Sequence, residues 1–308
     1  MTPSPGRAIH PDLRPAILAW FGARGRDLAF RATSDPYAIL VSEAMAQQTQ
    51  AARAAQYWTR FLEEFPTVGA LAGATPAAVL RAWRGLGYNR RALALRRAAV
   101  VIVRDHAGHV PDDLDALLSL PGVGPYTARA VAALAFGRRV GAVDVNVGRV
   151  LSRIVGGSLG SLGASELQTI ADASVPAEMP GAWTHALIDV GATFCGPRAP
   201  ACEPCPALPW CAYAQARPGT SPDPDRAASG SARAARERPP PFETTGRWLR
   251  GRLLDLLRDA SDGTWATIPD SLGGHGREAI EAALGSLTGD GLAERHPSDP
   301  RRARLPIA

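Results

Sequence analysis

The chain has 308 residues and a mass of 32.4 kDa, which exceeds one typical domain, so we expect two or three packed units. Hydrophobic residues make up 46% and charged residues 20%, as in globular proteins rather than in disordered or fibrous ones. No apolar run reaches the length of a membrane span, and the first ten residues carry no apolar stretch. The sequence therefore predicts neither a transmembrane helix nor a secretory signal.

The basic residues are all of one kind. The net charge is +5, and the 34 basic side chains are all arginine, with no lysine in the chain. A GC-rich codon bias explains this usage simply, but the chemical consequence does not depend on the cause. A Schiff base with a sugar aldehyde needs a primary amine, which a guanidinium cannot replace. We therefore exclude covalent chemistry that uses lysine. The α-amino group is the only primary amine that remains to form a Schiff base.

Residues 11–212 show a helical pattern, in which Ala, Leu and Arg dominate and Pro or Gly breakers recur at helix-length intervals. Residues 214–241 are rich in Pro, Ala, Ser, Gly and Arg and are expected to form a linker. Two short apolar-faced helices, around 248–257 and 280–287, and a tail follow. The sequence thus predicts an all-α body at 1–213 and a small winged-helix-like module at 242–308.

A glycine-rich string, Leu-Pro-Gly-Val-Gly-Pro-Tyr-Thr-Ala, occupies residues 120–128. Gly122, Val123 and Gly124 lie between the end of one expected helix and the start of the next. Such a turn is common between two helices, but glycine also permits close backbone approach, and free N–H groups at a helix start can hold a phosphate. The whole string resembles the helix-hairpin-helix of a DNA glycosylase superfamily, and this resemblance implies contact with a DNA backbone.

The four cysteines of the chain fall within one short segment, as Cys195, Cys202, Cys205 and Cys211. So few cysteines cannot form a disulfide scaffold, and their clustering indicates a metal centre in a reducing compartment. Four thiolates suit structural zinc and an iron–sulfur cluster alike, and their spacing alone does not choose between them.

Two carboxylates stand in apolar surroundings. Glu43 interrupts an apolar helical face, where burial would raise its pKa and retain a proton. Asp144 lies in an apolar run directly before a helix, with Asn146 two residues on, so helix capping is its simplest role and is compatible with catalysis. A single glutamate on an amphipathic helix is most often a surface residue, so the functional interpretation depends on the whole set.

Taken together, residues 10–213 resemble the MutY-type adenine DNA glycosylases of the helix-hairpin-helix superfamily that includes endonuclease III. The string Ser-Glu-Ala-Met-Ala-Gln-Gln-Thr-Gln at 42–50 carries most of the likeness. Leu-Gly-Tyr at 86–88, the glycine hairpin, the Asp144–Asn146 pair and the cysteine spacing support it. The resemblance implies a body with a six-helix barrel lobe at about 33–137 and an iron–sulfur lobe at about 10–32 and 138–213.

The resemblance also implies roles. Glu43 would protonate the flipped base, Asp144 would stabilise the cationic sugar, and Tyr126 and Asn146 would position Asp144 and the attacking water. Tyr126 stands where bifunctional relatives carry lysine. The implied base pocket is Arg26, Leu28, Phe30, Arg31, Ala46 and His185. The implied DNA contacts are Gln47, Gln48, Thr49, Tyr88, Gly122, Val123, Gly124 and Arg198. The implied ligands of a [4Fe–4S] cluster are Cys195, Cys202, Cys205 and Cys211.

The implied function is monofunctional hydrolysis of adenine mispaired with 8-oxoguanine or guanine. A cytoplasmic, nucleoid-associated monomer acting on double-stranded DNA with a mispair or an oxidised guanine is expected, without membrane contact. Phe30, Ala46 and His185 depart from the family pattern in the base pocket, so a thymine or other mismatch glycosylase remains an alternative. A non-catalytic DNA-binding protein is a second one. The short C-terminal module does not resemble the Nudix-like domain that many relatives carry.

Overall fold

The computed structural model describes residues 8–216 and 240–307. Most of the linker predicted at 214–241 lies outside these residues. The chain divides into two compact units, and each is considered by itself. The first comprises the described residues of Met1–Glu43, Asp112–Ser119 and Val123–Ala234, and the second those of Ala44–Pro111, Leu120–Gly122 and Ala235–Ala308. The lobe and domain boundaries expected from the sequence stay predictions.

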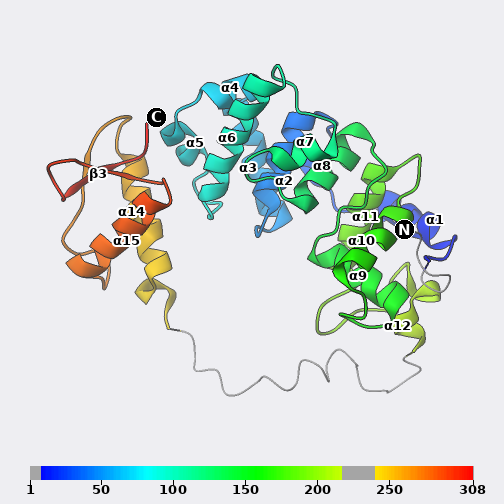
Figure 1. The fold of residues 1–308 in the computed structure, drawn as a ribbon. Coiled ribbons are helices and arrows are strands. Elements are labelled where there is room, and N and C mark those ends of the chain that lie inside the picture. The colour runs from blue at the N-terminus through cyan, green and yellow to red at the C-terminus, as the bar shows by residue number, and fades with distance from the viewer. Residues whose placement is uncertain (1–7, 217–239, 308) are drawn as a thin grey trace. The chain divides into compact units, whose positions relative to one another are not determined.

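In the described part of the first unit, the only regular elements are helices (Figure 1). Its core gathers apolar residues of α1, α9, α10 and α11, among them Ile17, Leu151, Trp183 and Val190, all almost completely buried. The helical elements are α1 (Leu13–Arg24), η1 (Ala29–Arg31), most of α2 (Pro36–Ala46), α7 (Leu114–Ser119), α8 (Pro125–Phe136), α9 (Val145–Gly156), α10 (Ala164–Ser174), α11 (Pro180–Thr193), η2 (Leu208–Trp210) and α12 (Ala212–Gln215).

Local sequence explains where the helices that carry chemistry begin and end. Helix α8 starts with Pro125, whose missing N–H is not needed in a first turn, and ends at Gly137 in the left-handed conformation. Helix α9 starts after Asp144, whose side chain caps it, and ends at Gly157, also left-handed. The capping role expected of Asp144 is thereby confirmed.

The second unit joins a helical part to the C-terminal module. The helical part contains α3 (Ala51–Glu64), α4 (Val68–Gly73), α5 (Pro76–Ala82) and α6 (Arg90–Asp105). Thr67 and Thr75 cap α4 and α5 by accepting backbone N–H groups at 3.1 Å. Trp83 and Phe61 pack edge to face inside this part, with ring centroids 5.8 Å apart.

The C-terminal module contains two packed helices and a small sheet. It comprises η4 (Phe242–Thr244), α14 (Gly246–Asp259), β1 (Ala266–Thr267), α15 (Arg277–Gly289), β2 (Glu294–Arg295) and β3 (Arg302–Arg304). The sheet is antiparallel with the order β1-β3-β2, and Ala303 pairs with Ala266 on one side and Arg295 on the other. The expected helices are present. The sheet was not predicted, because strands of two or three residues are too short to show an alternation of apolar and polar residues in the sequence.

No helix in the described part of the chain is both long and apolar enough to cross a membrane.

Candidate active site and cysteine loop

Glu43 is the buried acid of the first unit. Helix α2 carries it among Ile39, Leu40 and Val41, and only 6% of its surface is exposed. The phenol of Tyr126 donates a hydrogen bond to its carboxylate, while Oε2 has no hydrogen-bond partner among the described residues. Burial raises the pKa of Glu43 to about 7, against the opposing effect of Tyr126. Glu43 can therefore hold a proton near neutral pH and has a free oxygen to deliver it.

Tyr126 and Asp144 face Glu43 from the starts of α8 and α9. Burial and the neighbouring Glu43 carboxylate raise the pKa of Tyr126 well above its usual value, so the phenol stays neutral. The Asp144 carboxylate accepts the N–H groups of Asn146 and Val147 at 2.9 and 2.7 Å, and the Asn146 amide at 2.8 Å. These donors and the helix N-terminus stabilise a negative charge at a fixed position.

A buried aspartate organises the arginines beside this acid pair. Asp189, on α11, is completely buried and accepts two hydrogen bonds from Arg31 at 2.8 Å. It also accepts the backbone N–H and the guanidinium of Arg26 at 2.9 and 2.7 Å. These bonds lower the pKa of Asp189 despite its burial. Asp189 holds Arg31, whose positive charge in turn acts on Glu43.

Sequence reasoning did not identify Asp189. The signal was present, because Asp189 interrupts the apolar run of α11 in the same way that Glu43 interrupts that of α2.

A cavity of about 500 Å³ opens in the first unit next to this network. His185 lies in its wall, where burial lowers its pKa to about 3, so the imidazole is neutral at physiological pH. The His185 ring stacks on Phe21, with centroids 6.5 Å apart, and the Arg31 guanidinium lies over the same Phe21 ring at 5.4 Å. Four predicted pocket residues line the cavity, namely Arg26, Phe30, Arg31 and His185.

Two other predicted pocket residues lie elsewhere. Leu28 is buried but does not line this cavity, and Ala46 belongs to the second unit. Conversely, Phe21 and Ser42 line the cavity although the sequence did not indicate them. Phe21 is an ordinary apolar residue of α1 in the sequence, so only the packing of α1 on α11 reveals it.

Two predicted DNA contacts of the second unit, Gln48 and Tyr88, have unusual backbone conformations. Gln48 and Tyr88 have φ angles of +54° and +46°, and Ala107 is the one other described non-glycine residue with positive φ. Such strain persists where the surroundings impose it and often marks a functional position. Tyr88 is also 49% exposed, which is unusual for so large a ring. Both residues are therefore held in fixed positions at the surface.

Arg91 fixes the end of α2 and the segment after it. Its guanidinium donates to the carbonyls of Ala44 and Gln47 and, at 3.2 Å, to the Thr49 hydroxyl. Sequence reasoning missed this arginine, because nothing local distinguishes it from its neighbours on α6. In the hairpin, Gly122 has a φ of +79°, and a Cβ there would come within 2.6 Å of the Cβ of Ala94, so only glycine fits. Arg198 is exposed.

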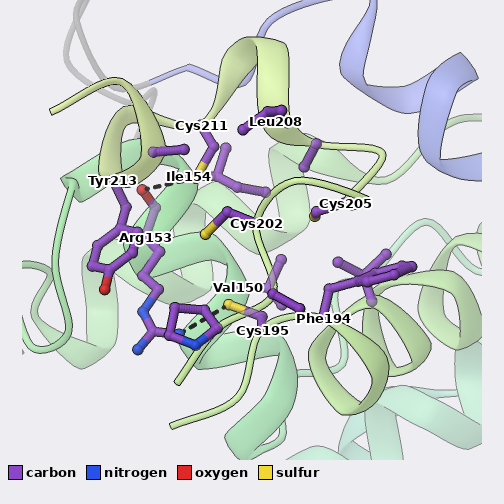
Figure 2. A pocket seen from close by; sticks show the side chains of 15 residues that line it. Val150, Arg153, Ile154, Phe194, Cys195, Cys202, Cys205, Leu208, Cys211 and Tyr213 are labelled. Carbon is purple, nitrogen blue, oxygen red and sulfur yellow. Dashed lines mark hydrogen bonds between the residues drawn. The ribbon is translucent and has the colours of Figure 1, made fainter. Parts of the chain in front are cut away.

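The four cysteine side chains line one cavity between α9, the end of α11 and α12 (Figure 2). Val150, Ile154 and Phe194 supply apolar walls, and Cys195, Cys205 and Cys211 pack against the core of the first unit. Burial raises the pKa of the Cys205 thiol to about 12, so this thiol stays protonated unless a bound cation stabilises its thiolate form. No described group of these side chains has the close geometry that holds a single metal ion. The wider spacing of sulfurs around a multi-iron cluster does not demand that geometry.

Two arginines of α9 contact the cysteine loop. Arg153 is almost completely buried, and its guanidinium donates to Cys195 Sγ at 3.3 Å (Figure 2). It also donates to the Gly196 carbonyl at 2.7 Å. The same group lies over the Tyr213 ring at 4.7 Å. Arg149 donates to the Cys195 carbonyl and to Asn146 Oδ1. Arg149 thus connects the cysteine loop to the partner of Asp144, a link that the sequence does not reveal.

Comparisons with known proteins agree with this geometry. Residues 41–160 match the sequence profile of the HhH-GPD superfamily base excision DNA repair proteins. The chain is 45% identical to the adenine DNA glycosylase of Mycobacterium tuberculosis over 248 residues, which cover 79% of this chain and 78% of that protein.

Solved structures resemble it as well. A thermostable thymine-DNA glycosylase matches with a TM-score of 0.62 and 32% identity, covering 66% of this chain and 95% of that one. Endonuclease III in a non-covalent complex with DNA matches with a TM-score of 0.57 and 25% identity, covering 67% and 96%.

Proposed function

The chain belongs to the adenine DNA glycosylase branch of the HhH-GPD superfamily of base excision DNA repair proteins, and on that premise we propose that it is a monofunctional adenine DNA glycosylase. Its substrate is adenine mispaired with 8-oxoguanine or guanine in double-stranded DNA, and it acts as a monomer. One observation carries the proposal: a buried glutamic acid with a pKa of about 7 and one unpartnered oxygen, beside a helix-capping aspartate.

The chemistry follows from the two carboxyl groups. Hydrolysis of a purine N-glycosidic bond needs an acid for the departing base and a negative charge near a sugar that becomes cationic. Glu43 supplies the proton from its free Oε2, and the phenol of Tyr126 steadies the other side of its carboxyl group. Asp144, held by the N-terminus of α9 and by Asn146, supplies the negative charge and orients the attacking water.

The arginine pair and the cavity receive the extruded base. Asp189 orients Arg26 and Arg31 at the wall of the cavity that also contains Phe30 and His185. A neutral imidazole can both donate and accept a hydrogen bond, which suits the edge of a purine. Gln47, Gln48, Thr49 and Tyr88 contact the duplex around the vacated position, and Gly122, Val123, Gly124 and Arg198 contact its backbone.

The four cysteines fit a [4Fe–4S] cluster. Cys195, Cys202, Cys205 and Cys211 line one apolar cavity and would hold it as thiolates. A bound cluster would attach the loop to the core of the first unit, and Arg149, which donates to the Cys195 carbonyl and to Asn146, connects that loop to the partner of Asp144.

A thymine-directed glycosylase is the second candidate. The solved thymine-DNA glycosylase matches this chain in fold, and Phe30 and His185 alter the walls of the base cavity. The two candidates share the acid and the aspartate and differ only in the released base.

Single-turnover base release on a panel of duplexes tests the proposal. The panel pairs A or T with G, 8-oxoguanine or C, and the free base is identified by mass. We expect free adenine from A·8-oxoguanine and A·G. Free thymine from T·G instead would support the second candidate, and no free base from any duplex would refute both.

The sequence also predicts the state of the DNA strand after the base is released. Because the chain contains no lysine and the Tyr126 phenol cannot form an imine, the strand should remain intact at the abasic site until alkali is added. Borohydride should trap little covalent enzyme–DNA adduct. Stoichiometric trapping with cleavage before alkali would contradict the absence of lyase activity.

A further inference from the structure

The turn that carries Tyr88 is held in a strained conformation at the surface of the second unit. Tyr88 has a φ of +46°, and 49% of its surface is exposed. A non-glycine residue keeps a positive φ only where neighbouring groups impose it. Two such groups belong to the helical part. The Trp83 indole donates to the Gly87 carbonyl at 3.1 Å, and the Arg91 guanidinium lies 5.3 Å from the Tyr88 ring centroid.

Asn89, the next residue, stands at the N-cap of α6 but does not act as a cap. Asparagine caps a helix from an extended backbone conformation, by accepting an N–H group of the first turn. Asn89 has helical angles instead, a φ of −58° and a ψ of −21°, and within the described chain its side chain accepts no N–H group of α6. Its Oδ1 accepts the guanidinium of Arg258 at 2.6 Å. A contact with the C-terminal module thus replaces the local bond that this residue type usually makes.

Arg258 is itself fixed from several sides. It is 7% exposed, and besides Asn89 it donates to the Leu80 carbonyl at 2.9 Å. It also donates to Asp255 of its own helix, α14, at 3.2 Å, so the buried charge has an anionic partner. Arg81 of α5 donates in return to the Arg258 carbonyl at 3.1 Å. Arg258 therefore presents its N–H group to Asn89 from a fixed position.

Helix α14 reaches the same turn with a second arginine. The Arg247 guanidinium lies 5.4 Å from the Tyr88 ring centroid. Positions 247 and 258 are about three turns apart and about 20° from one another around the helix, so they lie on one face of α14. One helix of the C-terminal module therefore contacts two successive residues of the turn.

We propose that Arg258 is a positioning residue: by holding Asn89 in its helical conformation, it keeps the Tyr88 ring in the pose that contacts DNA. The inference rests on the proposed function, in which Tyr88 contacts the duplex. Without this bond, Asn89 is free to take the extended conformation of an N-cap and to bond α6. That change rotates the backbone next to Tyr88, whose positive φ loses one of the groups that impose it. The C-terminal module then serves DNA binding from within the protein, through the conformation of one turn.

The pose is measured first in the full-length protein without DNA. The chain is labelled with 3-fluorotyrosine, and Tyr88→Phe assigns the Tyr88 signal in the fluorine NMR spectrum. We expect Arg258→Gln and Asn89→Leu to move or broaden this signal and to leave the other tyrosine signals in place. Arg301→Gln, at an exposed position of the same module, controls for the change in net charge and should not move it. A lower Tm with an unmoved Tyr88 signal would show that Arg258 only stabilises the fold, and would overturn the proposal.

Binding to an A·8-oxoguanine duplex whose adenosine analogue cannot be hydrolysed then relates the pose to function. Arg258→Gln should weaken binding about tenfold, as expected if about a tenth of the molecules keep the competent pose. Asn89→Leu should have the same effect, and it tests the bond with Arg258 in place even if Arg258→Gln is too unstable to purify. The double variant should bind no more weakly than either single variant, because both changes remove one bond.

Two results on DNA would overturn the proposal. The first is that the two changes act independently and multiply to about a hundredfold in the double variant. The second is normal binding by variants whose Tyr88 signal has moved, since the pose would then not matter to DNA. Base release by the unchanged protein, measured in parallel, reports on the proposed function separately.

Discussion

The carboxylate site and the cysteine loop place their chemistry in opposite ways. The cysteine loop takes its four thiols from seventeen consecutive residues, 195–211, so proximity along the chain already brings them together. The carboxylate site takes Glu43, Tyr126 and Asp144 from the starts or interiors of three helices, and its support from Asp189 on a fourth. The cysteine loop therefore depends on sequence spacing, and the carboxylate site depends on how helices pack. Loss of one residue should therefore have different consequences in the two regions.

The largest effect is expected at the carboxylates. Glu43→Gln and Asp144→Asn keep the shape of each side chain but remove the proton or the negative charge. We expect single-turnover base release to slow by about a thousandfold for Glu43→Gln and by at least about a hundredfold for Asp144→Asn, with binding to mispaired DNA retained. Glu63→Gln, at an exposed position of α3, is the matched control and should behave like the unchanged protein. Turnover at the normal rate by either variant would refute the role of that residue.

The cysteine loop should respond through stability and metal content. The unchanged protein should be yellow-brown and contain about four irons per chain. Cys202→Ala should lose the colour, and its Tm should fall by roughly 5 °C or more because the loop loses its attachment to the core. Iron analysis, the visible spectrum and thermal unfolding measure these changes. Active protein with one zinc and no iron would contradict the cluster.

Asp189→Asn probes the packing on which the carboxylate site depends. The substitution keeps the size of the side chain but weakens its bonds to Arg26 and Arg31, which lie at the wall of the base cavity. We expect base release to slow about tenfold and the free energy of unfolding to fall by about 2 kcal/mol. Asp115→Asn, an exposed aspartate of α7, is the control. Equal kinetics of both variants would show that Asp189 does not position the arginines for the reaction.

The pH dependence of stability gives a further test of the carboxylate site. Glu43 has a pKa of about 7 when folded, against an ordinary value of 4.5, so the folded state keeps a proton that the unfolded state loses between these values. Its contribution to stability is complete below pH 4.5 and is lost as the pH rises through 7. Relative to the unchanged protein, Glu43→Gln should gain up to about 3 kcal/mol between pH 4.5 and 8, in denaturant unfolding. A difference that does not change with pH would mean that Glu43 titrates normally.

Some features of the molecule were predictable from short stretches of sequence. The capping of α9 by Asp144 and the two helices of the C-terminal module depend on neighbouring residues, and the structure contains them as expected. The apolar surroundings of Glu43 likewise indicated its raised pKa, because the residues that precede it on α2 are apolar and are buried together with it. The spacing of the four cysteines likewise indicated that their side chains lie together, and in the structure all four line one cavity.

Other features depend on residues far apart in the chain, and only the tertiary structure decided them. Asp189 meets Arg31 across 158 positions, and Arg258 meets Leu80 across 178. The sequence by itself determined the local elements and the chemical groups, since helix periods, caps and clustered thiols act over a few residues. Which carboxylate steadies the arginines, and which arginine flanks Tyr88, follows from packing, because burial and hydrogen bonding select among many similar side chains only when the helices meet.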